Sequence, residues 1–305
     1  MIEVRFGVRW LRIWLIEVRA PFFIAVIIPV LVGATIAWSE GLFEPFLFSL
    51  TLASMILLNA GTNVLNDYFD YVSGIDLMTI KTPFSGGSGL LPRGILEPKS
   101  VYKAGLSFLI TATLIGIYLA TLRGYVILIL GLIGVFTAYF YSTQLAKRGV
   151  GELLVGINLG PLAVLGSYYV QVQRLALEPF VASLPIGLLI AGVLYINEFP
   201  DFDADKGADR YNLVVRLGRR RAADGYVLLM SSVYACIMIG VLLSILPLAS
   251  MISLVTFPYA LWASKTVRKC RGLDVPISVN RATIVIHVMA GITLTISYIL
   301  DTLLS

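Results

Sequence analysis

Two short clusters of acidic and amide side chains are the residues of this sequence best suited to chemistry. The first, residues 63–76, reads NVLNDYFDYVSGID, and the second, residues 197–209, reads NEFPDFDADKGAD. Their shared pattern N-[DE]-x-x-D comprises Asn66, Asp67 and Asp70 in the first cluster and Asn197, Glu198 and Asp201 in the second. The repeated spacing predicts that both clusters serve one site.

Helical spacing would gather the side chains of each cluster. Asn63, Asp67 and Asp70 lie at positions i, i+4 and i+7, so they would share one helix face. Asp201 and Asp205 are also four residues apart, and Asn197 precedes Asp201 by four. Carboxylate and amide oxygens suit Mg²⁺, which often binds through a few carboxylates plus the phosphates of a substrate. The chain has one histidine, which disfavours a zinc site.

Lysine and arginine side chains flank both clusters. They are Arg19, Lys81, Arg93, Lys147, Lys206 and Arg210. A phosphorylated ligand bound through Mg²⁺ and these cations would explain why acids and bases occur together. An ion-coupled secondary transporter is the alternative, but transporter sites lie near the membrane midplane, and ion coupling would leave the bases unexplained. Product formation by purified protein in detergent would discriminate the two.

Apolar segments of membrane-spanning length precede and separate the clusters. Of the 305 residues, 58% are hydrophobic and 13% charged, and the mean hydropathy is +0.89. A spanning helix needs about 20 mostly apolar residues. Nine such segments lie at about 20–38, 46–66, 101–121, 124–143, 151–170, 180–199, 225–244, 247–265 and 283–303. We therefore expect an all-α, polytopic membrane protein, a single domain over 1–305 with nine transmembrane helices around a central cavity.

The distribution of lysine and arginine predicts the orientation in the membrane. These residues concentrate in the N-terminal segment and after the even-numbered helices, whereas Arg123 and Arg174 alone fall on the other side. By the positive-inside rule the basic side is cytoplasmic, which puts the N-terminus inside and the C-terminus outside the plasma membrane. The net charge of +5 then reflects topology, so no nucleic-acid partner is expected.

Two further features concern the basic side. Arg5, Arg9 and Arg12 share one helix face, which favours an interfacial amphipathic helix over residues 1–19; a frayed start of the first span is the alternative. The connections 67–100 and 200–224 are the long ones, and each contains one of the clusters. We expect these two loops to cap the central cavity.

With these motifs the chain resembles the UbiA superfamily of intramembrane prenyltransferases. That family pairs an NDxxD-type first motif with a DxxxD second motif, which are NDYFD, with a delayed Asp76, and DFDAD here. The longer gap from Asp70 to Asp76 resembles the branch that prenylates 1,4-dihydroxy-2-naphthoate in menaquinone synthesis. The runs RAPFFIAVIIPVLVG (19–33), LGPLAVLGSYYV (159–170) and DFDADKGADRYNLVVRLG (201–218) are similar to the same branch.

The resemblance implies transfer of an isoprenyl group from an isoprenyl diphosphate to an aromatic acceptor. It implies two Mg²⁺ ions held by Asn63, Asp67, Asp70, Asn197, Asp201 and Asp205. The expected substrate contacts are Arg19, Asn66, Lys81, Arg93, Lys147 and Arg210. Tyr139 is expected to face the allylic carbocation, and Asp76 or Asp203 to take a proton from the acceptor. Geranylgeranylglyceryl phosphate, a hydroxybenzoate and haem are the alternative acceptors within the superfamily.

Overall fold

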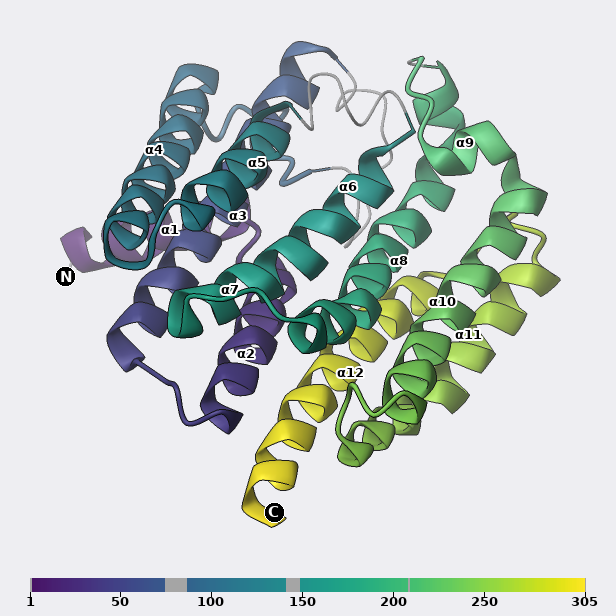
Figure 1. The fold of residues 1–305 in the computed structure, drawn as a ribbon. Helices are drawn as coiled ribbons and strands as arrows, with labels where there is room; N and C mark the ends of the chain where they lie inside the picture. The colour runs from purple at the N-terminus through teal and green to yellow at the C-terminus, as the bar shows by residue number, and fades with distance from the viewer. Residues whose placement is uncertain (1, 75–86, 141–148, 208, 305) are drawn as a thin grey trace.

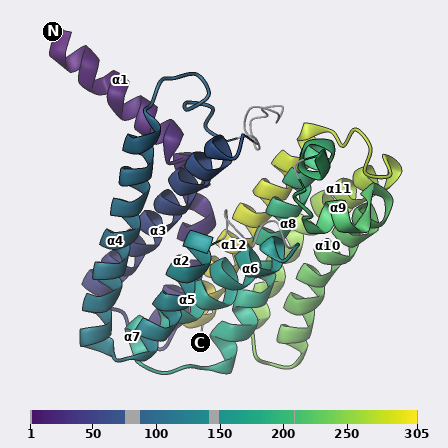
Figure 2. The same cartoon turned by 90° about the horizontal axis from the view of Figure 1, so that it is seen from above.

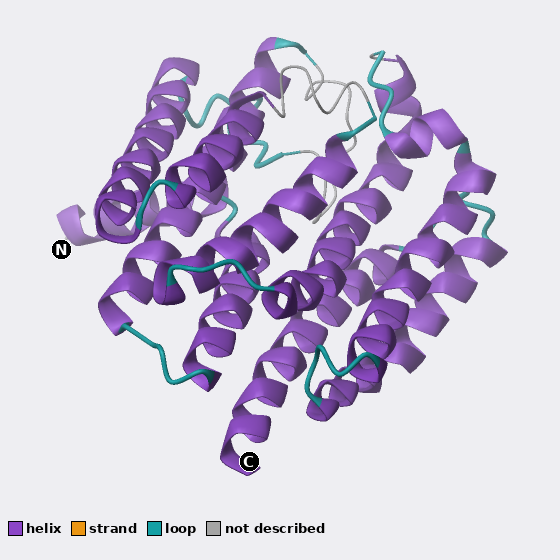
Figure 3. Ribbon diagram, in the orientation of Figure 1, coloured by secondary structure: helices purple, strands orange, loops and turns teal. Residues whose placement is uncertain are grey.

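The computed structural model describes residues 2–74, 87–140, 149–207 and 209–304. In these ranges the chain consists of helices joined by loops and turns, and the described residues contain no strand (Figure 3). The all-α prediction is therefore confirmed. Asp76, Lys81 and Lys147, which the sequence proposed as site residues, lie outside the described residues.

Seven helical stretches of the described chain are long and apolar enough to cross a membrane. They are η1–α2 (Ala20–Ser39), α3 (Pro45–Val72), α4 (Pro98–Arg123), α6–η5–α7 (Gly151–Val172), α8 (Leu177–Gly207), α10 (Arg219–Leu242) and α12 (Ile277–Leu304). The two remaining predicted ranges are occupied by α5 (Val126–Phe140) and by η6 (Leu248–Thr256) with α11 (Phe257–Lys269), which do not reach that measure within the described residues. The polytopic helical fold is confirmed, whereas the count of nine spans is not.

The helices pack into a bundle with segments from both halves of the chain at its centre (Figure 1). Helix α3 packs against α4, and α4 against α5, while α8 packs against α10 and α12. Helix α2 contacts α3 of the first group and α12 of the second, so it joins the two groups. This arrangement places α3 and α8, which carry the two clusters, in different parts of the bundle with the α6–η5–α7 stretch between them (Figure 1).

The N-terminal helix α1 (Ile2–Glu17) projects from the bundle, as the view from above shows (Figure 2). Its side chains Trp10, Leu11 and Leu15 are exposed, whereas Glu17 at its end is buried. Exposed aromatic and aliphatic side chains on a helix outside the bundle suit a location in the membrane interface. The interfacial role of residues 1–19 stays a prediction.

Residues 63–72 of the first cluster and 197–207 of the second lie on continuous helices, because α3 runs to Val72 and α8 to Gly207. The predicted helix ends near 66 and 199 are therefore too early, and the connections that follow are shorter than expected. In α8, Pro200 has no N–H to donate to the carbonyl of Ile196, four residues earlier. Asn280 of α12 supplies the missing donor, since its Nδ2 lies 3.2 Å from that oxygen. A partner helix thus stabilises the second cluster in helical form.

A short π-helix, η5 (Asn158–Leu162), interrupts the stretch between α6 (Gly151–Ile157) and α7 (Ala163–Val172). The N–H of Ala163 donates to the carbonyl of Asn158, and Pro161 within this turn has no N–H of its own. The turn packs closely against α8, because a Cβ added at Gly160 would lie 2.5 Å from the Cα of Gly187. π-Helical turns often occur at functional sites, and this one carries Asn158 into the cavity described next.

Candidate active site

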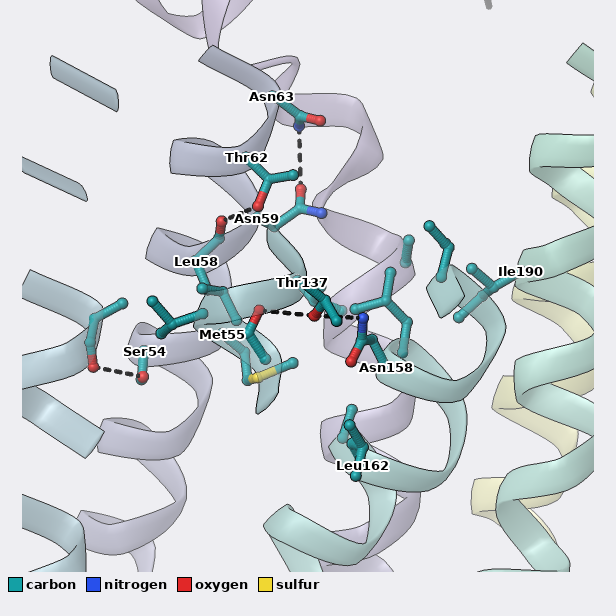
Figure 4. A pocket seen from close by; sticks show the side chains of 18 of the residues that line it. Ser54, Met55, Leu58, Asn59, Thr62, Asn63, Thr137, Asn158, Leu162 and Ile190 are labelled. Carbon is teal, nitrogen blue, oxygen red and sulfur yellow. Dashed lines mark hydrogen bonds between the residues drawn. The ribbon is translucent and has the colours of Figure 1, made fainter. Parts of the chain in front are cut away.

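A cavity of about 550 Å³ lies inside the bundle and is lined by α2, α3, α4, α5, the α6–η5–α7 stretch and α8. Its polar end gathers side chains of both clusters and their neighbours: Arg19, Asn63, Asn66, Asp70, Asn197, Glu198, Asp201, Asp205, Arg210 and Asn212. Much of the remaining wall is apolar and includes Met55, Leu58, Leu162 and Ile190 (Figure 4). A polar end joined to an apolar chamber suits a ligand with a charged head and a hydrocarbon body.

The cavity face of α3 is a stripe of amide and carboxylate side chains. Asn59, Asn63, Asn66 and Asp70 lie at i, i+4, i+7 and i+11, and all four line the cavity. Asn63 donates through Nδ2 to the carbonyl of Val18 at 3.1 Å and to Oδ1 of Asn59 at 3.2 Å (Figure 4). Asn66 donates to Oδ2 of Asp70 at 2.8 Å. Asn59 was not among the predicted site residues, although the same four-residue spacing connects it to Asn63.

The side chain of Asp67 does not point into the cavity. It follows Asn66 by one residue, and successive residues of an α-helix are rotated by about 100°. It is 1% exposed, and the cavity lining does not include it. One carboxylate oxygen pairs with Arg19, and the other accepts the backbone N–H of Ser88 at 2.7 Å. The hydroxyl of Ser88 in turn donates to Glu17 at 2.7 Å. Asp67 therefore lies outside the cavity lining and holds Arg19, which does line the cavity, although the charge of Asp67 still acts on Asp70.

We expect Asp67→Asn to weaken binding of an anionic substrate without changing any dependence of the reaction on Mg²⁺. Asparagine can still accept the Ser88 N–H, but it loses the ion pair that holds Arg19 in place at the cavity. Because Arg19 is then no longer fixed where an anionic substrate would bind, affinity should fall about tenfold, about 1.4 kcal/mol. The measurements are the KM for an isoprenyl diphosphate, the donor that the sequence resemblance implies, and the Mg²⁺ concentration for half-maximal rate. A large increase in the Mg²⁺ requirement, such as that expected for Asp70→Asn, would instead make Asp67 a metal ligand.

The second cluster presents Asn197, Asp201 and Asp205 to the cavity at i, i+4 and i+8 of α8. Asp205 is 5% exposed and accepts a hydrogen bond from Nδ2 of Asn212 at 2.7 Å. Asn212 also caps α9 (Leu213–Leu217), because its Oδ1 accepts the N–H of Val215 at 2.9 Å. Asn212 was not among the predicted site residues, although an asparagine just before the helical run 213–217 is a typical N-cap signal.

The side chain of Asn197 is oriented by a distant residue. Its Oδ1 accepts a hydrogen bond from Nδ2 of Asn280 at 2.8 Å, so this oxygen is directed toward α12. A metal bound through that oxygen would have to share it with Asn280 or displace the bond. Asn280 lies 2% exposed in α12, and no local pattern in the sequence singles it out.

Arg210 joins the two clusters at the polar end. Its Nη1 lies 3.9 Å from Oδ1 of Asp70, and its charge also acts on Asp205. Asp70 and Asp205 are near enough for their negative charges to repel each other. Asp70 and Asp205 therefore form one electrostatic unit with Arg210, although they are 135 positions apart in the chain.

The donor set at this end fits Mg²⁺. Within the described residues, no three histidine, cysteine or acidic side chains are grouped closely enough to hold a metal alone. The available donors are carboxylate and amide oxygens on two helices, which are hard ligands. Mg²⁺ usually keeps several waters and completes its coordination with substrate phosphates, so a site that is incomplete without a phosphorylated ligand is the expected kind.

Three expected site residues do not face the cavity. The side chain of Asp203 is 84% exposed and pairs with Arg219 at 2.8 Å. Arg93 is exposed on the loop before α4. The ring of Tyr139 packs edge-on against Phe69, with centroids 6.2 Å apart, and the described cavity wall does not include it. The structure therefore does not bring these side chains together with Asp70 and Asp205.

Comparison with known proteins identifies the family. Residues 26–298 match the UbiA prenyltransferase family. The 1,4-dihydroxy-2-naphthoate octaprenyltransferase of Mycobacterium tuberculosis is 33% identical over 229 residues, 73% of this chain and 75% of that protein. The Bacillus subtilis protein of the same name is 28% identical over 198 residues, 64% of this chain and 62% of that protein, which is less than two thirds of its length.

The fold comparison agrees. A solved structure of a UbiA homolog from Archaeoglobus fulgidus bound to DMAPP and Mg²⁺ superposes with a TM-score of 0.67 at 15% identity, covering 93% of this chain and 98% of that chain. The chain therefore belongs to the UbiA prenyltransferase family and is an integral membrane enzyme that transfers prenyl groups. The resemblance found in the sequence is confirmed.

Proposed function

We propose that this enzyme transfers an isoprenyl group from an isoprenyl diphosphate to 1,4-dihydroxy-2-naphthoate in an Mg²⁺-dependent reaction of menaquinone synthesis. The observation that carries the proposal is the meeting of Asp70, Asp205 and Arg210 at the polar end of an apolar cavity. The names of the M. tuberculosis and B. subtilis relatives support the acceptor. The DMAPP and Mg²⁺ bound to the A. fulgidus homolog support a prenyl diphosphate donor and the metal.

The polar end suits the diphosphate of the donor. Asp70, Asp201 and Asp205 would hold two Mg²⁺ ions, with help from the amide oxygens of Asn63 and Asn66. Bound Mg²⁺ would neutralise the charge that develops on the leaving diphosphate. Arg210 and Arg19 line the same end and would contact the diphosphate oxygens directly.

The apolar wall suits the isoprenoid tail and protects the reaction. Loss of diphosphate from C1 leaves an allylic cation that water would capture, so a dry chamber favours transfer to the ring. The electron-rich ring of the acceptor forms the new bond to C1 and then loses a proton. The carboxylate of the naphthoate would remain near the basic residues of the polar end, which we place on the cytoplasmic side of the plasma membrane by the distribution of lysine and arginine.

A side-by-side assay of acceptors tests this function. With one prenyl diphosphate, dihydroxynaphthoate should be prenylated at least about tenfold faster than geranylgeranylglyceryl phosphate or a hydroxybenzoate, a difference of about 1.4 kcal/mol in the barrier. Product identity is checked by mass spectrometry. Faster prenylation of the glyceryl phosphate would refute the proposed acceptor while leaving the family assignment intact.

A further inference from the structure

We propose that Asn59 and Asn158 recognise a hydroxyl group of the aromatic acceptor and thereby select its dihydroxy form over its quinone form. The inference rests on the proposed function and names the chemical group of the acceptor that this cavity would bind. Both side chains line the cavity, Asn59 from α3 and Asn158 from the π-helical turn η5.

The amide of Asn158 is held in one orientation by a chain of hydrogen bonds. The hydroxyl of Thr137 lies 2.7 Å from the carbonyl of Ile133 and 3.0 Å from that of Gly134. A backbone carbonyl can only accept, so Thr137 uses its one proton there and accepts the Nδ2–H of Asn158, 2.7 Å away. The carbonyl oxygen of Asn158 is consequently on the far side of the amide from Thr137 (Figure 4).

The amide of Asn59 is held by its oxygen, whereas that of Asn158 is held by its NH₂ group. Asn63 donates through Nδ2 to the backbone carbonyl of Val18, which fixes the orientation of Asn63. The same Nδ2 donates to Oδ1 of Asn59, so the NH₂ group of Asn59 is the end that remains for a ligand (Figure 4). The cavity therefore receives one anchored acceptor, Oδ1 of Asn158, and one anchored donor, Nδ2 of Asn59.

Neither of these two atoms is used by the described part of the chain. Oδ1 of Asn158 and Nδ2 of Asn59 take part in no hydrogen bond among the described residues. Their surroundings include Met55, Leu58 and Leu162, which cannot satisfy them (Figure 4). A ligand that fills this part of the cavity excludes water, and a polar group then left without a partner costs about 1–3 kcal/mol, so the ligand should supply partners.

Ligand chemistry decides which partner fits. An isoprenoid tail has no polar atom to offer. A quinone oxygen can accept from Asn59 but has no proton for Asn158. A phenolic hydroxyl both donates and accepts, so it can satisfy either amide. The dihydroxy ring is also the form whose electrons can attack the allylic cation, so recognition of a hydroxyl would keep the unreactive oxidised acceptor out of the cavity.

The experiment compares the binding of several ligands to the wild type and to variants, and it needs no catalytic turnover. Dissociation constants are measured anaerobically in detergent, with a non-transferable thiolodiphosphate analogue of the donor present. The ligands are 1,4-dihydroxy-2-naphthoate and its two mono-hydroxy analogues, which each lack one hydroxyl. The proteins are the wild type, Asn158→Leu, Thr137→Val and the matched control Thr113→Val. Thr113 also lines the cavity, but its hydroxyl bonds to its own helix at Leu109, 2.8 Å away.

We expect the wild type and Thr113→Val to prefer the dihydroxy ligand over one mono-hydroxy analogue by at least about tenfold, about 1.4 kcal/mol. Asn158→Leu should lose that preference, and Thr137→Val should weaken it because the amide can then rotate. Unchanged binding of the thiolodiphosphate analogue will show that each variant is folded.

Two results would overturn the inference, and they are distinguishable from failure of the proposed function. If Asn158→Leu keeps the preference for the dihydroxy ligand, the amide of Asn158 does not recognise the hydroxyl group. If the variant instead weakens only the thiolodiphosphate analogue, Asn158 contacts the prenyl donor. If the wild type binds no naphthoate at all, the proposed acceptor fails and this inference fails with it.

Discussion

Asp70→Asn or Asp205→Asn should each lower kcat/KM by about a thousandfold, about 4 kcal/mol of transition-state stabilisation. Asparagine keeps the size of the side chain and one oxygen, but it removes the negative charge that Mg²⁺ requires. It also leaves Arg210 without one of the carboxylates that its charge now balances. The measurement is steady-state transfer by purified enzyme at saturating Mg²⁺.

The double variant tests whether the two clusters act as one site. Residues that act as a unit give non-additive losses, so Asp70→Asn with Asp205→Asn should lose little more than either change alone. The matched control is Asp203→Asn, the same change on the same helix at an exposed position paired with Arg219, which should stay within about twofold of the wild type. Losses that multiply would contradict a shared site.

Arg210→Met should lower kcat/KM for the prenyl diphosphate by about a hundredfold, about 2.7 kcal/mol. Methionine fills part of the volume but cannot neutralise either the carboxylates or the diphosphate. Since Asp70 and Asp205 remain, the dependence on Mg²⁺ should persist. Steady-state kinetics with varied prenyl diphosphate measures the effect.

Arg219, nine residues further along the chain, provides the comparison for Arg210. Arg219 pairs with the exposed Asp203 and lies 4.5 Å from the centroid of the Phe202 ring, outside the cavity lining. Arg219→Met should therefore leave the KM for prenyl diphosphate nearly unchanged. Equal losses in the two variants would mean that Arg210 acts through the general positive charge of this region and not through contact with the substrate.

Helical spacing predicted much of the site and also explains two differences. It predicts one helix face for Asn63, Asp67 and Asp70, and of these Asn63 and Asp70 line the cavity whereas Asp67 does not. It could not decide between neighbours such as Asn66 and Asp67, because that depends on how the helix is rotated. In the structure the rotation is coupled to contacts of Asp67 with Arg19 and Ser88, which come from segments far away in the sequence.

The second cluster shows the effect of a distant helix on local structure. Proline at position 200 favours a helix end before it, which would leave Asp203 in a loop and available to a substrate. Asn280 donates to the carbonyl of Ile196 that Pro200 leaves without a donor, so α8 continues to Gly207. Asp203 precedes Asp205 by two residues on that helix, which corresponds to a rotation of about 200°. Asp203 is therefore directed away from the face that carries Asp205.

The orientation of cavity amides also depends on contacts between helices. The spacing within α3 contains the information for Asn59, but nothing near Asn158 in the sequence predicts that Thr137 of α5 orients its amide. The π-helical turn that positions Asn158 depends on Pro161 and on the close approach of Gly160 to Gly187. Such pairings become visible only when the packing of α5, η5 and α8 is known.

Metal-dependent binding of the diphosphate tests the central claim most directly. Purified protein in detergent is titrated with labelled geranylgeranyl diphosphate in EDTA and again after excess Mg²⁺ is added. We predict that affinity in EDTA is at least about a hundredfold weaker, about 2.7 kcal/mol, and that Mg²⁺ restores it in the wild type but not in Asp70→Asn. Full-affinity binding in EDTA would contradict the claim that the two clusters hold the prenyl diphosphate through Mg²⁺.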